Sequence, residues 1–274
     1  MIHIVKMTSN ANDPTENSEP SSAPRARRRA TRTTQILTLA MRQVETEGLE
    51  GLTLQMIARD LDYSVPALYR YFPSKDALVA ELQRRVIALL DHKHAEVEGR
   101  TQNWLADQSP EDQKRFSALA PIAATGLFYA GLARSAPQAF GLLAASLGDP
   151  RHLIDDSQAS AVIATALPMF DRLAHSIRVA VEAGQLDPGN APDRVLVLWA
   201  SLHGVAQLAK LERLAPGRLD SQILCGSLLE ALLIGWGADA NWITELIGAI
   251  HSEGIASATV TADDLVKIAS IEGE

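Results

Sequence analysis

Apolar residues recur along most of the chain at the three- and four-residue spacing of helices, and no useful stretch alternates as a β-strand does. In residues 33–47 this spacing makes one apolar stripe, formed by Ile36, Leu37, Ala40, Met41 and Val44. Gly48 is expected to end this helix, because glycine adopts the left-handed backbone common at helix ends. The pattern predicts an all-α protein.

Two short helices joined by a tight turn are expected next. The first should begin after Thr53 and the second after Ser64, because both residues are good N-caps. Pro66 is tolerated in the first turn of the second helix, where its missing N–H would have no helical partner. A longer helix should follow Ser74 and continue to about Val97.

The later segments are longer and more apolar, and the helices expected there span residues 110–134, 136–147, 151–185, 191–214, 219–238, 240–252 and 262–270. Residues 1–24 are rich in Ser, Asn, Pro and Glu. They are expected to be disordered because they cannot bury enough apolar surface to offset their ordering entropy. The pattern therefore predicts an extension, a small helical head and a larger helical body.

The net charge of −8 is unevenly distributed. Residues 25–90 carry 11 Lys and Arg against 7 Asp and Glu, whereas residues 91–274 carry 13 against 23. A polyanion would attract the first part and repel the second. This asymmetry favours a nucleic-acid surface near the N-terminus.

Composition narrows the class of protein further. Apolar residues make up 47% of the chain, yet no apolar run reaches the roughly 18–20 residues that span a bilayer, so no membrane partner is expected. Residues 1–7 are too short and too polar for a secretory signal. The single Cys225 excludes a disulfide framework and a cysteine-based zinc site. These features predict a cytoplasmic location.

Two short helices behind a longer supporting helix have the plan of a helix-turn-helix. In the second short helix, Leu68 and Phe72 are four residues apart and should pack inward. The opposite face would then present Val65, Pro66, Ala67, Arg70 and Tyr71 to a DNA major groove. An arginine in that position can bind a guanine through two hydrogen bonds.

The cluster T…IA..L..S...LY.YF.SK..L, from Thr53 to Leu78, resembles the N-terminal domain of the tetracycline-repressor (TetR) family over about residues 33–82. The resemblance implies a transcriptional regulator that binds DNA. Asp62 and Ala67 depart from the common pattern, which has glycine and often threonine at these positions. The altered Ala67 position leaves one phosphate or base contact in doubt.

The resemblance and the helix-turn-helix geometry together predict the DNA-binding residues Thr53, Gln55, Ser64, Val65, Pro66, Ala67, Tyr69, Arg70, Tyr71, Lys75, Arg27, Arg28 and Arg29. Tyr69, Tyr71 and Lys75 are assigned to phosphates, and the alternative for the two tyrosines is packing within the head. The arginines near residue 28 form either an arm that enters a minor groove or a basic tail that attracts phosphates without specificity.

The family resemblance also implies a homodimer, in which helices near residues 191–214 and 219–238 form a four-helix bundle with the partner. Trp199, His203 and Gly204 make a W…HG pattern that resembles a named C-terminal subgroup of the family. An apolar pocket between the body helices would take a small apolar or aromatic effector. Its candidate residues are Trp104, Phe128, Tyr129, Phe140, Met169, Phe170, His175, Trp199, His203 and Gln207.

No metalloprotease, serine-hydrolase or phosphate-loop motif is present, so neither an enzyme nor a cofactor is predicted. We expect a disordered extension with an arginine-rich arm (1–30), a helix-turn-helix DNA-binding domain (31–80) and a helical ligand-binding and dimerisation domain (81–274). The predicted function is a repressor that binds a (pseudo)palindromic double-stranded operator and is released by its effector. The alternative is a small-molecule-binding or enzymatic helical protein with a non-functional head.

Overall fold

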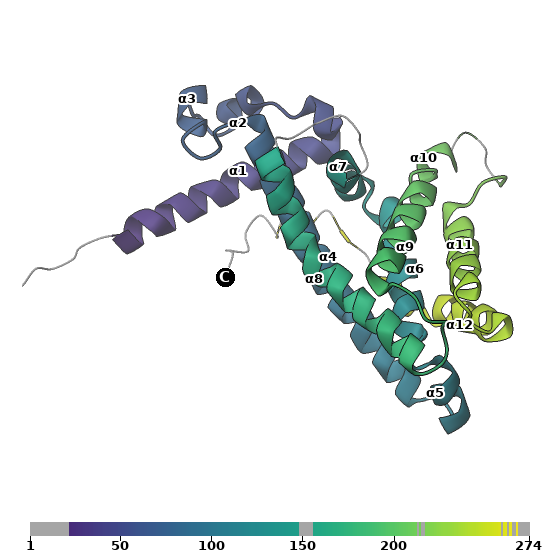
Figure 1. Ribbon diagram of the computed structural model, residues 1–274. Coiled ribbons are helices and arrows are strands. Elements are labelled where there is room, and N and C mark those ends of the chain that lie inside the picture. Colours follow the sequence, from purple (N-terminus) through teal and green to yellow (C-terminus); the bar gives the residue numbers. More distant parts are fainter. Residues whose placement is uncertain are drawn as a thin grey trace, which may run out of the picture.

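The computed structural model describes residues 22–147, 156–212, 214, 217–258, 260, 261, 263, 264 and 267. Every regular element among them is an α-helix, as the sequence predicts. Figure 1 shows a small head at one end of a larger helical body.

The head consists of α1 (Ser22–Gly51), α2 (Leu54–Asp60) and α3 (Val65–Leu68). The apolar stripe predicted for α1 is buried in full, with all five side chains at most 1% exposed. Gly48 has a φ of 73° and kinks α1 near its end, while Asp62, with a φ of 54°, forms the turn between α2 and α3. Aspartate tolerates this left-handed conformation better than most residues, so the turn forms without the usual glycine.

The helix α4 (Lys75–Ala106) joins the head to the body. The Ser74 hydroxyl caps it by accepting a hydrogen bond from the Ala77 N–H. This single helix has 32 residues and is therefore about 48 Å long. It runs from the head along the whole body (Figure 1), so a shift in the body can reach the head directly.

The body contains α5 (Pro110–Phe116), α6 (Ala120–Ser135), α7 (Pro137–Leu147), α8 (Asp156–Glu182), α9 (Ala191–Ala206), α10 (Ala209–Glu212), α11 (Ser221–Gly235) and α12 (Ala240–Ser252). The central helix is α6, which packs against α4, α7, α8, α9, α11 and α12. Gly126 allows α6 to lie close to α11, because a Cβ there would lie 3.2 Å from the Leu229 side chain. A helix packed on all sides is expected to be apolar all round, as α6 is.

Several boundaries differ from the sequence prediction. The segment 110–134 is two helices, because Phe116 turns inward and the chain changes direction before α6. The segment 191–214 is likewise divided into α9 and α10, and α4 extends nine residues beyond the expected end at Val97. Most of the helix expected at 262–270 lies outside the described residues.

The largest correction concerns the N-terminal extension. Residues 1–21 lie outside the described residues, but residues 22–30, expected to belong to the disordered extension with its arginine-rich arm, form the first turns of α1. Ala26, Ala30 and the arginines among them all favour helix, which explains the longer helix in local terms. A polar composition thus predicts disorder for the extension, but the helix propensity of its last residues decides their structure.

Within the described residues, no single helix is long and apolar enough to cross a membrane. Among these residues, only the consecutive helices α5 and α6, taken together, are long and apolar enough for a membrane span, and their axes are bent by 61° relative to each other.

Candidate nucleic-acid interface and ligand cavity

The helix-turn-helix places α3 with one side in the head and the other in solvent. Leu68 and Phe72 are buried, as their four-residue spacing predicts. Pro66 and Arg70 are exposed, and Val65 and Ala67 are half-buried. Although α3 itself ends at Leu68, backbone hydrogen bonds continue its turns as far as Phe72. The exposed side is therefore a short, rigid surface with Arg70 near one end.

The two expected caps behave differently. The Thr53 hydroxyl caps α2 by accepting a hydrogen bond from the Met56 N–H at 3.3 Å. Ser64 occupies the N-cap position of α3, but its side chain makes no capping hydrogen bond and is exposed. The Ser64 hydroxyl therefore remains available to an external partner, as does the exposed side chain of Gln55.

The residues assigned to phosphates surround α3. The Tyr69 side chain is 48% exposed. Tyr71 is half-buried, and the Arg29 guanidinium lies 5.4 Å from its ring centre. The Lys75 ammonium donates to the Leu49 carbonyl oxygen at 3.3 Å, so it also fixes the end of α1. A lysine ammonium has three donors, which leaves two for a phosphate.

The arginines of the expected arm are separated by the helix that contains them. Arg27, Arg28 and Arg29 are all exposed. Arg28 and Arg29 line a groove between α1 and α3, whereas Arg27 does not. The other arginines in this groove are Arg25, Arg32 and Arg70.

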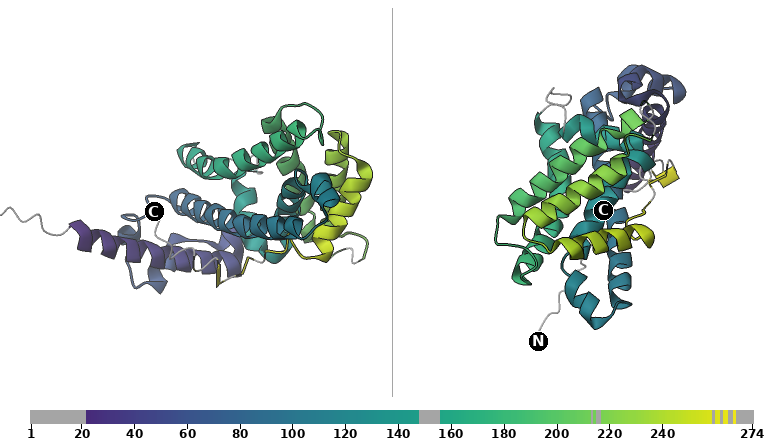
Figure 2. Two further views of the ribbon diagram at one scale, coloured as in Figure 1. Left: turned by 90° about the horizontal axis from the view of Figure 1, so that it is seen from below. Right: turned by 90° about the vertical axis from the view of Figure 1, so that its right-hand side faces the viewer.

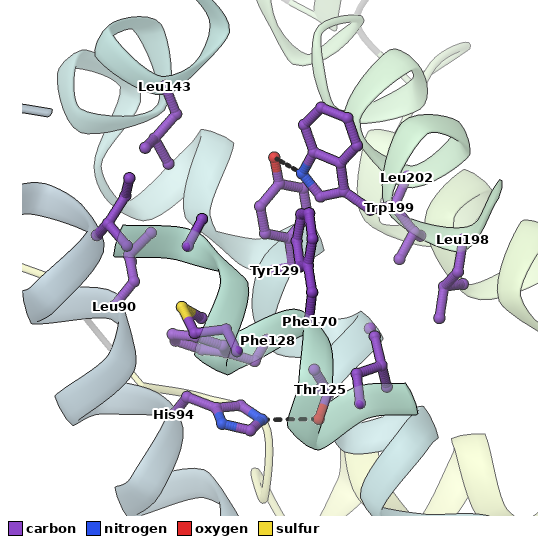
Figure 3. Close-up of a pocket in the computed structure, with 15 residues that line it drawn as sticks. Leu90, His94, Thr125, Phe128, Tyr129, Leu143, Phe170, Leu198, Trp199 and Leu202 are labelled. Carbon is purple, nitrogen blue, oxygen red and sulfur yellow. Dashed lines mark hydrogen bonds between the residues drawn. The ribbon is translucent and has the colours of Figure 1, made fainter. Parts of the chain in front are cut away.

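The body contains a cavity of about 80 Å³ lined by residues of α4, α6, α7, α8 and α9 (Figure 3). Its walls are almost wholly apolar. The lining residues are Ile87, Leu90, His94, Thr125, Gly126, Phe128, Tyr129, Leu143, Ala166, Met169, Phe170, Leu173, Leu198, Trp199 and Leu202. No lining side chain is a carboxylate, lysine or arginine.

One polar group of the cavity is a network around the Tyr129 hydroxyl. The Trp199 indole N–H donates to this hydroxyl at 3.2 Å, and His203 Nδ1 lies 2.7 Å from it. His203 is buried and stacks on Phe140 at 4.9 Å, and its Nε2 has no hydrogen-bond partner among the described atoms. Burial raises the pKa of Tyr129 and lowers that of His203, so both groups are neutral near pH 7.

The second polar group, His94 with Thr125, lies at the opposite end of the cavity (Figure 3). The Thr125 hydroxyl donates to the Pro121 carbonyl oxygen at 2.7 Å, so it accepts from His94 Nε2, also at 2.7 Å. Burial lowers the pKa of His94, and the Glu98 carboxylate, 3.6 Å from Nδ1, partly opposes this shift. Sequence reasoning missed this pair, since a histidine on a long amphipathic helix gives no sign of which helix it faces.

The ten residues predicted to bind the effector occupy three kinds of position. Five line the cavity, namely Phe128, Tyr129, Met169, Phe170 and Trp199. Phe140 and His203 stack on each other, and both contact the Tyr129 ring without stacking on it. The other three do not reach it, because Trp104 packs on Phe116, His175 is exposed on α8, and Gln207 follows the end of α9.

Two further findings limit the chemistry of the body. The described residues contain no group of three or more His, Cys, Asp or Glu side chains that could hold a metal ion. Arg134, at the end of α6, pairs with Glu212 and Asp220.

Large apolar side chains remain exposed on α9 and α11, which pack side by side (Figure 2). Leu196 is 51% exposed and Ile223 is 67% exposed, and the others on these helices are Val197, Leu224 and Ile234. The small residues Ala200 on α9 and Ala231 on α11 are exposed as well.

Solved structures share this fold at low sequence identity. A protein of unknown function from Rhodococcus sp. RHA1 is 22% identical, with a TM-score of 0.54 over 81% of this chain and 99% of that one. RolR in complex with resorcinol is 15% identical, with a TM-score of 0.53 over 81% and 95%. A regulatory protein in the tetR family from Rhodococcus RHA1 is 16% identical, with a TM-score of 0.50 over 77% and 98%. No curated protein sequence matches the chain.

Family sequence models match both parts of the chain. Residues 36–82 match "Bacterial regulatory proteins, tetR family", and residues 122–232 match "Tetracyclin repressor-like, C-terminal domain". The second match contains the W…HG pattern of Trp199, His203 and Gly204. Since the two matches together cover more than half of the sequence and agree with the helix-turn-helix head and helical body, this chain belongs to the TetR family of bacterial transcriptional regulators.

Proposed function

We propose that the protein is a homodimeric repressor that binds a (pseudo)palindromic operator and is released by a small, uncharged aromatic effector. The observation that carries the proposal is the course of α4, which begins in the head and lines the cavity with Ile87, Leu90 and His94. Leu90 is 15 residues from Lys75, or about 22 Å along the helix axis. A ligand against Leu90 would therefore press on the same rigid element that carries the head.

The DNA contact is assigned to the exposed side of α3. A major groove is about 12 Å wide and admits a helix, and Pro66 and Ala67 are small enough for close approach. Arg70 would supply the base contact that discriminates sequence. Ser64, Val65, Thr53, Gln55, Tyr69, Tyr71 and Lys75 would contact bases or phosphates around it.

The dimer contact is assigned to the exposed apolar face of α9 and α11. Contiguous apolar surface of this kind marks an interaction site. A two-fold axis through this face would pair the same helices of two subunits and hold two heads at a fixed spacing. Such a spacing suits half-sites whose centres lie about 34–36 Å apart.

The cavity supports an effector without charge. An ionised carboxylate enclosed by these apolar walls would lack a cation partner, and burying an unpaired charge is very costly. Phe128, Phe170 and Trp199 offer flat surfaces to an aromatic ring, and the Tyr129 hydroxyl offers a hydrogen bond. RolR, which has the same fold, was solved with its ligand resorcinol.

The size of the cavity supports a conformational response. At about 80 Å³ it is smaller than the roughly 150 Å³ cavity known to admit benzene. An aromatic effector must therefore move side chains such as Met169, or the helices themselves. Binding would then favour a wider arrangement of α4 and α8, and the operator affinity would fall by the difference in effector affinity between the two states.

The decisive experiment selects bound duplexes from a random pool and then adds candidate effectors. We expect an inverted repeat to be enriched, its affinity to fall steeply with salt, and neutral phenols to release it while benzoates and acyl-CoA esters do not. Native mass spectrometry of the same sample should show a dimer. A pool that stays random, with phenols still bound by the body, would instead support the helical ligand-binding protein with a non-functional head.

A further inference from the structure

Four arginines form a single stripe along the first turns of α1. Arg25, Arg28, Arg29 and Arg32 follow the i, i+3, i+4, i+7 spacing that brings side chains to one helix face, and all four are exposed. Arg27 lies on another side of the same turns. We call the four residues the basic stripe.

The basic stripe faces the recognition element, by which we mean α3 and the turns that continue it as far as Phe72. Together with Tyr63, Ala67, Arg70 and Tyr71 of the helix-turn-helix it lines one groove, and none of the groove's lining residues is acidic. Figure 1 shows α1 extending from the body beneath α3. The shared groove places the stripe beside the surface assigned to the major groove.

Specific contacts hold the stripe in this position. The Arg29 Nη2 donates to the Arg70 carbonyl oxygen at 3.2 Å, and its guanidinium lies 5.4 Å from the centre of the Tyr71 ring. The Arg32 guanidinium lies 5.2 Å from the Tyr63 ring centre. The turns of α1 that carry Arg29 and Arg32 are therefore fixed against the recognition element.

This arrangement is electrostatically unfavourable for the protein alone. Like charges three and four residues apart repel one another on a helix, and cations at a helix N-terminus oppose the helix dipole. The repulsion acts on all four arginines and the helix dipole acts on Arg25 at the start of α1, and the groove holds no carboxylate to relieve either effect. A polyanion in the groove would remove both penalties.

We propose that the basic stripe binds the sugar–phosphate backbone of duplex DNA that flanks the major groove occupied by α3. This inference rests on the proposed function of the head. Arg25 and Arg32 are about 10 Å apart along the helix axis, a length over which one strand presents about three phosphates. A helix is about 10–12 Å across and a minor groove about 6 Å wide, so a helical stripe contacts the backbone and does not enter the minor groove.

The stripe has two parts with different roles. Arg25, Arg28 and Arg32 present charge to the phosphates, whereas Arg29 is a positioning residue that joins α1 to Arg70 and Tyr71. Arg29→Lys keeps the charge but loses the planar guanidinium. We expect it to increase hydrogen exchange at residues 26–32 in the free protein, while Arg28→Lys does not.

The main test measures operator affinity of the full chain against salt concentration. We expect the triple variant Arg25→Ala, Arg28→Ala, Arg32→Ala to lower the slope of log K against log salt by about 2–3, since each phosphate contributes about 0.9. Its preferred sequence should not change. In the matched pair of single variants, Arg28→Ala should lower the slope by about 0.9 and Arg27→Ala should leave it unchanged.

Alanine keeps the helix, and circular dichroism of the triple variant verifies this. An unchanged salt slope in the triple variant would overturn the proposal, as would loss of binding when minor-groove adenines are methylated at the flanks. If the hydroxyl-radical footprint of the triple variant is shorter than that of the unmodified protein by about three phosphates per half-site, this would support the proposal. If the unmodified protein selects no duplex at all, the proposed function fails instead, and the two failures are thereby distinguished.

Discussion

The head and the body of this protein differ in how their sites are built. The head site is an exposed surface whose main residues lie within the short stretch from Thr53 to Lys75. The body site is an interior cavity whose walls come from five helices, between Ile87 and Leu202. The first depends on local geometry and charge, whereas the second depends on how distant helices pack. The two sites should therefore respond differently to substitution, salt and pH.

The largest effect is expected from separating the two subunits of the proposed dimer, which also separates their two heads. Leu196→Glu combined with Ile223→Glu places charges on the apolar face of α9 and α11. Losing the dimer removes the advantage of binding two half-sites at once, so operator affinity should fall by on the order of 10²–10⁴-fold. Sedimentation velocity and operator titration measure both changes.

Ile163→Glu on α8 provides the matched control. The exposed fraction of Ile163 is 47%, similar to the 51% of Leu196, but Ile163 lies outside the proposed dimer face. It should leave both the oligomeric state and the affinity unchanged. A double variant that stays dimeric would show that the subunits meet through another surface.

The second prediction separates base contacts from phosphate contacts within the head. Arg70→Ala should lose about 1–3 kcal/mol of discrimination at one base position and leave the other positions unaffected. Lys75→Ala should weaken binding to all sequences alike and reduce the salt slope by about 1. Titrations against a set of single-base operator variants distinguish these outcomes. Equal losses on every duplex for Arg70→Ala would place that side chain on phosphate.

The head could be predicted from sequence because its signals are local. The spacing of Leu68 and Phe72 fixes which side of α3 is buried, and Thr53 and Ser74 form the caps expected of them. The exception is the segment before residue 33. Its helix is held by Arg29 against Arg70 and Tyr71, residues about 40 positions away, and composition gives no information about such contacts.

The cavity was only partly predictable for the same reason. Two of the aromatic residues proposed from sequence, Tyr129 and Trp199, lie on apolar helices that face each other and are joined by a hydrogen bond. His175 also lies on a largely apolar helix, but its side chain is exposed to solvent, because α8 is covered on one side only. Only the packing of α4 on α6 reveals the pair of His94 and Thr125.

The third prediction concerns the polar network in the cavity. Tyr129→Phe removes the acceptor of the Trp199 N–H and the partner of His203 Nδ1, which leaves buried polar groups without hydrogen bonds. The free energy of unfolding should fall by about 1–3 kcal/mol, and neutral phenols should bind more weakly. Denaturant unfolding and ligand titration measure the two effects. Tyr69→Phe, at an exposed position of the head, is the control and should change neither.

The smallest expected effect is a pH dependence that belongs to the body. Burial lowers the pKa of His203 in the folded protein below the value of about 6.5 expected in the unfolded chain. The unfolded state therefore takes up a proton first as the pH falls, so stability is fully present above about pH 6.5 and decreases below it. Each histidine that stays neutral in the fold contributes at most about 1.4 kcal/mol per pH unit.

Unfolding free energies at pH 7.5, 6.5 and 5.5, at one protein concentration, test this dependence through its slope. His203→Gln should flatten the decrease below pH 6.5, whereas His92→Gln, at an exposed position of α4, should leave it intact. His94 should contribute in the same direction, because burial also lowers its pKa, although the Glu98 carboxylate partly opposes this shift. Since the recognition surface of the head contains no histidine, operator contacts should be indifferent to the same pH change. A parallel loss of stability in all variants would place the titrating group outside the cavity network.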